Sequence, residues 1–182
     1  MLLHPHISYK YMDSPWGKLT LAASPKGLFG IWFEGQKHAP NIQAWVSEPR
    51  NAHLLQAEAL LKAYFDGQWP QGQSARDRLN TLSLDLSAGT EFQQAVWQAL
   101  MSIPLGQTCS YGQLASAIGR PSAVRAVGTA IGRNPFSILI PCHRVLGGQG
   151  QMTGYAGGIW RKQALLQLEK ALSPSKSVST PS

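Results

Sequence analysis

The hydrophobic period of the sequence changes near residue 88, and this change divides the chain into two parts. Before it, apolar residues recur at every second position in three runs, which is typical of strands with one buried face. The runs are separated by short turns and cover residues 7–12, 19–23 and 28–33. They predict an antiparallel meander. After Gly89 the apolar spacing is helical, so we expect an α+β fold with domains at 1–87 and 88–172.

The rest of the first part predicts one helix and one more strand. Asn51 is placed to cap a helix that ends near Gly67, with apolar positions at Leu54, Ala57, Leu61 and Phe65. Residues 68–81 are polar and irregular, and the alternation of Leu82, Leu84 and Leu86 predicts a strand that could close the small sheet. Titratable groups are not clustered at catalytic spacing in residues 1–86, so we expect this part to act as a support domain.

The second part predicts four helices. Thr90 and Gln93 have the form of a capping box, opening a helix that Pro104 and Gly106 end. A helix at 111–118, a tight turn, and a helix from an N-cap at Ser122 to about Gly132 would form a helix-turn-helix, although an ordinary helical hairpin fits these residues equally well. A last helix is expected at 160–172, followed by a Ser/Pro/Lys tail at 173–182 without apolar period, which we expect to be disordered.

The composition indicates which class of partner and which cellular compartment to expect. A net charge of +7 and a pI near 9.7 favour a polyanion such as nucleic acid. Two cysteines imply no disulfide framework, and neither a signal peptide nor a membrane span is evident, so we expect a reducing, cytoplasmic location without membrane attachment. The histidines are scattered, so no metal site is predicted.

The run from Ile138 to Leu146 places Cys142 directly beside His143 in an otherwise apolar segment. A cysteine in such a run is often only a small core residue. Here Pro141 forces a bend just before the thiol, and the glycines at 147, 148 and 150 follow it. A strained turn that presents Cys142 as a nucleophile, with a base beside it, is therefore the better interpretation.

Two helical faces carry unusual residues. In the helix after Ser122, Val124, Val127 and Ile131 form the inward stripe, which leaves Arg125, Ala126 and Thr129 outward with Gly128 and Ala130 nearby. A glycine inside a helix suggests close approach of another molecule to the backbone, and a basic neighbour suits nucleic acid. In the last helix, Glu169 and Lys162 fall inside the apolar arc, so Glu169 should have a buried partner such as an imidazole, unless both side chains reach solvent at the margin.

These motifs together resemble the O6-alkylguanine-DNA alkyltransferase family. The matching segments are Ser110 to Ala115, Arg125 to Gly128, Asn134-Pro135, Ile140 to Val145, Gly154 to Gly158 and Leu168-Glu169. The resemblance covers roughly residues 88–170 closely and the first part only in layout. It implies a small ribonuclease H-like antiparallel-sheet domain and a helical domain that contains a winged-helix-like helix-turn-helix.

The resemblance also implies direct DNA repair by a protein that is used once. Cys142 would accept the alkyl group from guanine O6, with His143 taking the thiol proton through a water and Glu169 orienting the imidazole. Tyr111 and Lys162 match the residues that assist the departing oxygen. No external cofactor is implied, and zinc is not expected because the N-terminal cysteines that hold it in some relatives are missing here.

Double-stranded DNA carrying O6-alkylguanine is the implied partner, bound through the minor groove by a monomer after the base is flipped out. Arg125 matches the residue that replaces the flipped base, and further DNA contacts are implied for Ser110, Tyr111, Ala126, Gly128, Thr129 and Ala130. Asn134 would brace the active-site turn, and the pocket would be lined by Pro141, Val145, Tyr155 and Ala156. Ala156 stands where some relatives carry serine, so only its backbone could donate to O6.

Several alternatives stay open at this stage. Repair of thymine O4 adducts, the accepted size of the alkyl group and cooperative binding along DNA are undecided. A module that recognises alkylated bases without chemistry, a cysteine hydrolase built on Cys142, His143 and Glu169, and a regulatory helix-turn-helix protein are the competing functions.

Overall fold

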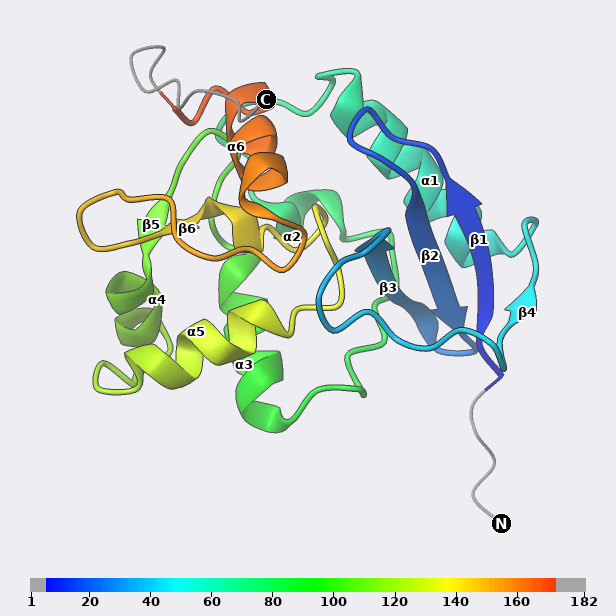
Figure 1. Cartoon of the computed structure of the whole chain (residues 1–182), viewed down its shortest axis with the longest axis horizontal. Coiled ribbons are helices and arrows are strands. Elements are labelled where there is room, and N and C mark those ends of the chain that lie inside the picture. The colour runs from blue at the N-terminus through cyan, green and yellow to red at the C-terminus, as the bar shows by residue number, and fades with distance from the viewer. Residues whose placement is uncertain (1–5, 173–182) are drawn as a thin grey trace.

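The computed structural model describes residues 6–172. Its four-stranded sheet lies in one half of the molecule, and most helices lie in the other half together with a two-stranded pair (Figure 1). The sheet has the order β3-β2-β1-β4, in which β1 (Ser8–Met12), β2 (Leu19–Ser24) and β3 (Gly27–Phe33) form the predicted antiparallel meander. The fourth strand, β4 (Val46–Ser47), pairs in parallel with β1. It was not predicted, because two exposed residues carry no detectable period.

Helix α1 (Ala52–Phe65) lies along the sheet and covers one of its faces (Figure 1). Its predicted cap is confirmed, since the Asn51 side chain accepts hydrogen bonds from the backbone N–H groups of His53 and Leu54. Leu54, Ala57 and Leu61 are fully buried against the strands. Burial of this apolar stripe fixes the helix on the sheet.

The predicted strand at residues 82–86 is wrong. Only one isolated parallel bridge joins Leu84 to Leu28, with backbone hydrogen bonds from Leu28 to Ser83 and from Asp85 to Leu28. The Asp85 carboxylate accepts hydrogen bonds from Ser24 Oγ and from the backbone N–H of Ser87. This local turn bends the chain away from the sheet, so the pairing stops after one residue.

The helical half is built around α3 (Glu91–Leu100), which packs against α4 (Tyr111–Ala117) and α5 (Val124–Gly132). The predicted capping box is present: Thr90 accepts from the Gln93 backbone, and the Gln93 side chain accepts from Thr90 N–H. Helices α4 and α5 form the predicted helix-turn-helix. The remaining short elements are α2 (Ala75–Arg78), in a segment expected to be irregular, a 3-10 turn η1 (Cys142–Arg144), and the parallel pair β5 (Cys109–Ser110) and β6 (Val145–Leu146).

The start of α5 differs from the prediction. Ala123 is the N-cap and no side chain caps the helix there, so the expected role of Ser122 is wrong. Val124 was placed on the inward stripe but is 38 % exposed, and Arg125 and Ala126 after it are exposed too, so the first turn of α5 is not covered. The inward face is formed by Val127, Ile131 and Ala130.

The last helix, α6 (Ile159–Leu168), ends four residues before the predicted Leu172. Glu169 is its C-cap, and Lys170 adopts a left-handed backbone conformation with φ of 55°, which stops the helix. Glu169 is nevertheless buried, as its place in the apolar arc predicted. The tail at 173–182, expected to be disordered, lies outside the described residues.

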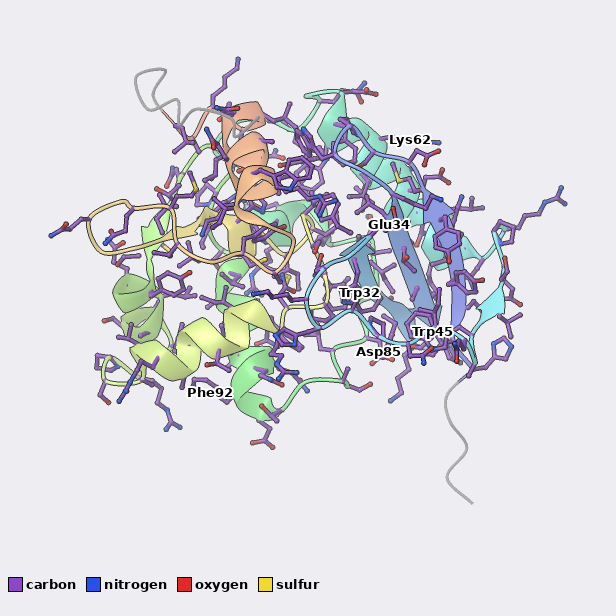
Figure 2. All side chains as sticks on the ribbon, in the orientation of Figure 1. Trp32, Glu34, Trp45, Lys62, Asp85 and Phe92 are labelled. Atoms are coloured by element: carbon purple, nitrogen blue, oxygen red, sulfur yellow. The ribbon has the colours of Figure 1, made fainter. Side chains whose placement is uncertain are left out.

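A single buried cluster crosses the boundary between the two halves. It includes Leu21 and Leu61 from the sheet half and Val96, Val127 and Leu165 from the helical half. A smaller aromatic cluster forms on the sheet, where the ring centres of Trp32 and Trp45 are 6.0 Å apart (Figure 2). None of the helices between residues 6 and 172 combines the length and apolar character needed to cross a bilayer.

Candidate active site

Cys142 sits at the start of the 3-10 turn η1, directly after a tight backbone turn. Inside that turn the buried Ile138 has φ of 73°, a conformation that costs a β-branched residue roughly 1–3 kcal/mol. Asn134 holds the turn: its Oδ1 accepts from Phe136 N–H at 3.0 Å, and its Nδ2 donates to the Ile140 carbonyl at 2.9 Å. The bent, strained presentation of the thiol expected from Pro141 is therefore observed.

The sheet half supports this turn directly. The backbone N–H of Ile31 on β3 donates to the Pro135 carbonyl at 2.7 Å, and Ser137 N–H donates back to Ile31 at 3.0 Å. The Ser137 hydroxyl also donates to Gln36 Oε1 at 2.7 Å. The support role expected for residues 1–86 thus has a structural basis, because a sheet edge fixes the turn that carries Cys142.

The buried partner predicted for Glu169 is His143, whose Nε2 lies 2.7 Å from Glu169 Oε1. Arg144 binds the same carboxylate from the other side, with Nε 2.8 Å from Oε2 and Nη2 3.0 Å from Oε1. Burial alone would raise the pKa of the Glu169 carboxyl, but His143 and Arg144 outweigh this effect and lower it to about 2. Glu169 is therefore a carboxylate whose charge is balanced by Arg144.

Arg144 was not among the predicted site residues, although a signal existed. It is a cation inside an apolar run, and a buried cation must be paired. Its side chain is 1 % exposed, and Nη1 also donates to the Ile103 carbonyl at 2.6 Å.

His143 is fully buried, and burial lowers the pKa of its imidazole despite the neighbouring Glu169. Because a carboxylate can only accept a hydrogen bond, a neutral imidazole that faces it through Nε2 must carry its proton on Nε2. Its Nδ1 has no hydrogen-bond partner among the described residues. That nitrogen is consequently the one able to accept a proton.

Burial raises the pKa of the Cys142 thiol, while the Asn134 side chain and the charge of Lys162 act in the opposite direction. Cys142 is therefore held mainly as a thiol, and reaction requires a base. Lys162 is also buried, which lowers its pKa to about 8. Its Nζ donates to the carbonyls of Val145 and Thr153, at 2.6 and 2.9 Å.

A cavity of about 440 Å³ opens beside Cys142. Its volume lies in the range of small-ligand pockets, roughly 300–1,000 Å³. Predicted site residues along its lining are Cys142, Tyr111, Gly128, Tyr155 and Ala156. Pro141, Val145 and Lys162 were also expected here, but all three are buried and absent from the lining. Lys162 instead bridges two backbone segments.

Seven of the twelve lining residues were not among the predicted site residues, and two of these seven come from the sheet half. Lys37 and His38 come from the loop after β3, and the Lys37 N–H donates to the Ala156 carbonyl at 3.0 Å. The sequence of this loop carries no pattern that would predict its contact with Ala156, more than one hundred residues away.

The outer face of α5 continues from this cavity. Arg125, Ala126 and Thr129 are exposed, and Gly128 is partly exposed and lines the cavity next to the Tyr111 ring. Ser110 is partly buried and caps α4. Ala130 was grouped with the DNA-contacting residues, but it is only 2 % exposed and its carbonyl accepts from Trp97 Nε1, so it belongs to the core.

Comparison with known proteins gives the same division of the chain. A model described as the ribonuclease-like domain of 6-O-methylguanine DNA methyltransferase matches residues 7–71, and one described as the DNA-binding domain of the same protein matches residues 91–171. The exact boundary at residue 87 stays a prediction.

Similar proteins extend over nearly the whole chain. A methylated-DNA–protein-cysteine methyltransferase of Mycobacterium tuberculosis is 45% identical over 169 residues, covering 93% of this chain and 96% of the relative. One from Haemophilus influenzae is 40% identical over 162 residues, covering 89% and 86% of the two chains. The crystal structure of Mycobacterium tuberculosis OGT in complex with DNA matches with a TM-score of 0.77 at 44% identity, over 92% of this chain and 96% of that one. The chain therefore belongs to the methylated-DNA–protein-cysteine methyltransferase family.

Proposed function

We propose that this protein repairs alkylated DNA by moving the alkyl group from guanine O6 to its own Cys142. The observation that carries the proposal is the pairing of two neighbouring residues. The free thiol of Cys142 lines a cavity, and Nδ1 of the adjacent His143 has no hydrogen-bond partner within residues 6–172. The names of its relatives, and the DNA complex of one of them, support the same activity.

In this mechanism the Cys142 sulfur attacks the alkyl carbon while the bond between that carbon and O6 breaks. The thiol proton passes to His143 Nδ1, through a water, because Nε2 is engaged by Glu169. Glu169 then faces an imidazolium, which it stabilises as the third member of a relay. The product thioether has no leaving group that would reverse the transfer, so each protein reacts once.

The guanine leaves as an anion unless its oxygen receives a hydrogen bond or a proton. Tyr111 is the better candidate for that role, because it lines the cavity and its oxygen accepts from Thr153 Oγ1 at 3.2 Å, which leaves its own O–H free to donate. Lys162 is absent from the lining and donates to the carbonyls of Val145 and Thr153. We assign it to holding those segments together.

A guanine inside a duplex cannot reach a buried thiol, so the nucleotide must be flipped into the cavity. Arg125 projects from the exposed face of α5, beside the cavity-lining Gly128, and would fill the space left by the base. The small residues Ala126 and Gly128 allow this helix to lie close in the minor groove. We further propose a monomer acting in the cytoplasm, where the acceptor thiol stays reduced.

The test compares the two cysteines of the chain. Cys142→Ala should lose all transfer from duplex DNA carrying O6-methylguanine while its DNA affinity changes little. Cys109→Ala is the matched control and should keep both properties, because Cys109 lies on β5 and is absent from the cavity lining. Transfer that survived in Cys142→Ala would overturn the proposed mechanism.

A further inference from the structure

Tyr64, on the sheet-packed helix α1, reaches the site from the opposite half of the molecule. Its hydroxyl donates to Glu169 Oε1 at 2.8 Å, and the side chain is 2 % exposed. The ring packs edge-on against Trp69 and Phe65, with centres 5.1 and 5.6 Å away. A phenylalanine would make the same ring contacts, so the hydroxyl group needs a separate explanation.

One oxygen of the Glu169 carboxylate, Oε1, accepts hydrogen bonds from three side chains. These donors are Tyr64 Oη, His143 Nε2 and Arg144 Nη2, whereas Oε2 has Arg144 Nε as its only donor within residues 6–172. The phenol and the imidazole therefore meet at the same atom. Burial and the Glu169 charge raise the pKa of Tyr64, so the phenol remains a donor at any working pH.

The helix that carries Glu169 does not itself fix this carboxylate. Glu169 is the C-cap of α6, and Lys170 after it leaves the helical conformation. A second residue of the sheet half compensates here, since Gln71 Nε2 donates to the Glu169 backbone carbonyl at 3.2 Å. Tyr64 and Gln71 thus hold the side chain and the backbone of one residue that lies about one hundred positions away.

We propose that Tyr64 is a positioning residue for alkyl transfer: its hydroxyl fixes Glu169 Oε1 where that oxygen accepts the hydrogen bond from His143 Nε2. This inference rests on the proposed relay from His143 to Glu169. It gives the sheet half of the molecule a part in the chemistry as well as in support, because the catalytic network is complete only when α1 is docked.

Tyr64→Phe tests the proposal, since it removes the hydroxyl and keeps the ring. Loss of one hydrogen bond to a carboxylate should slow single-turnover transfer roughly tenfold, without a matching change in DNA affinity. Tyr9→Phe is the matched control, because Tyr9 packs in the separate aromatic cluster on the sheet and should transfer at the wild-type rate.

A double-mutant cycle separates positioning from a general loss of structure. If Tyr64 acts through Glu169, Tyr64→Phe should have almost no further effect on transfer in the Glu169→Gln background. Additive losses in the double variant would overturn the proposal. If Tyr64→Phe transfers at the wild-type rate and Glu169→Gln is slow, the role of Tyr64 is overturned and the relay is not. If Glu169→Gln itself transfers at the wild-type rate, both the relay and the inference about Tyr64 are overturned.

A spectroscopic measurement on the DNA-free protein does not depend on transfer. The ring Nε2–H resonance of His143 reports its hydrogen bond to Glu169 Oε1, and it should move in Tyr64→Phe and stay in Tyr9→Phe. Replacing Tyr64 by 3-fluorotyrosine keeps the hydroxyl and alters its donor strength, so it guards against misfolding of the phenylalanine variant. An unchanged His143 resonance in both position-64 variants would overturn the proposal.

Discussion

Glu169 joins groups from two distant parts of the chain: Tyr64 and Gln71 from the end of α1 and the segment after it, and His143 and Arg144 from the active-site turn. A buried carboxylate is stable only when its hydrogen bonds and its charge are satisfied. Removing Glu169 therefore affects stability as well as transfer, because Arg144 would be left buried without its counter-ion.

Glu169→Gln should lower the free energy of unfolding by about 3 kcal/mol near neutral pH, since the pKa of Glu169 falls from 4.5 to about 2 on folding. A carboxyl with a lowered pKa contributes stability above its unfolded pKa, and this contribution disappears as the pH falls toward 2. The difference between wild type and variant should accordingly narrow from pH 5.5 to pH 3. Urea unfolding at each pH measures it, and a constant difference would contradict the assignment of the shift to Glu169.

Sequence reasoning found the residues whose neighbours in the chain were already unusual. Cys142 and His143 are adjacent in an apolar run, and Glu169 occupies a core position on a helical wheel. Tyr64 could not be found in this way, because an aromatic residue on a packed helix looks like ordinary core. Its function depends on a contact across 105 residues, which only the folded chain reveals.

Arg125 lies in the first turn of α5, on the exposed side that we propose faces DNA. If Arg125 replaces the flipped base, it lowers the free energy needed to extrude a nucleotide from a duplex and has no such task with a free base. Arg125→Ala should therefore slow transfer from duplex O6-methylguanine at least roughly tenfold more than transfer from the free alkylated base.

The control for this prediction is Arg50→Ala, which removes the same charge from an exposed turn before α1. Single-turnover rates with the two substrates decide the outcome. Equal losses on duplex and free base would mean that Arg125 acts on the pocket and not on the stack.

The sequence predicted helix ends correctly where the capping side chain and its backbone partners are close together in the chain. Asn51 and Thr90 cap α1 and α3 as predicted, because each side chain finds its partner within three residues. The strand at 82–86 failed because the Asp85 side chain competes for backbone groups, and the inward placement of Val124 failed because it lies in an uncovered first turn. Both errors arose because the hydrophobic period of a segment does not show which side chains or helices will lie next to it in the fold.

The molecule as a whole joins its two halves through a shared core and through hydrogen bonds. The buried cluster is continuous from the sheet to α6, and β3 is bonded to the turn before Cys142. Both halves should consequently unfold in one cooperative transition. Tryptophan fluorescence and far-ultraviolet circular dichroism, followed through the same urea titration, should give one coincident midpoint; separated midpoints would show that the halves fold independently.

In the proposed reaction Cys142 keeps one alkyl group and each protein is used once. Intact-protein and peptide mass spectrometry, after mixing the protein with limiting and then excess duplex DNA carrying O6-methylguanine, tests this most directly. We predict a gain of one methyl per protein, located on Cys142, that stops at one equivalent and is missing in Cys142→Ala. Lesion binding without any methyl gain would contradict transfer, and continued lesion removal by an unmodified protein would indicate a hydrolase.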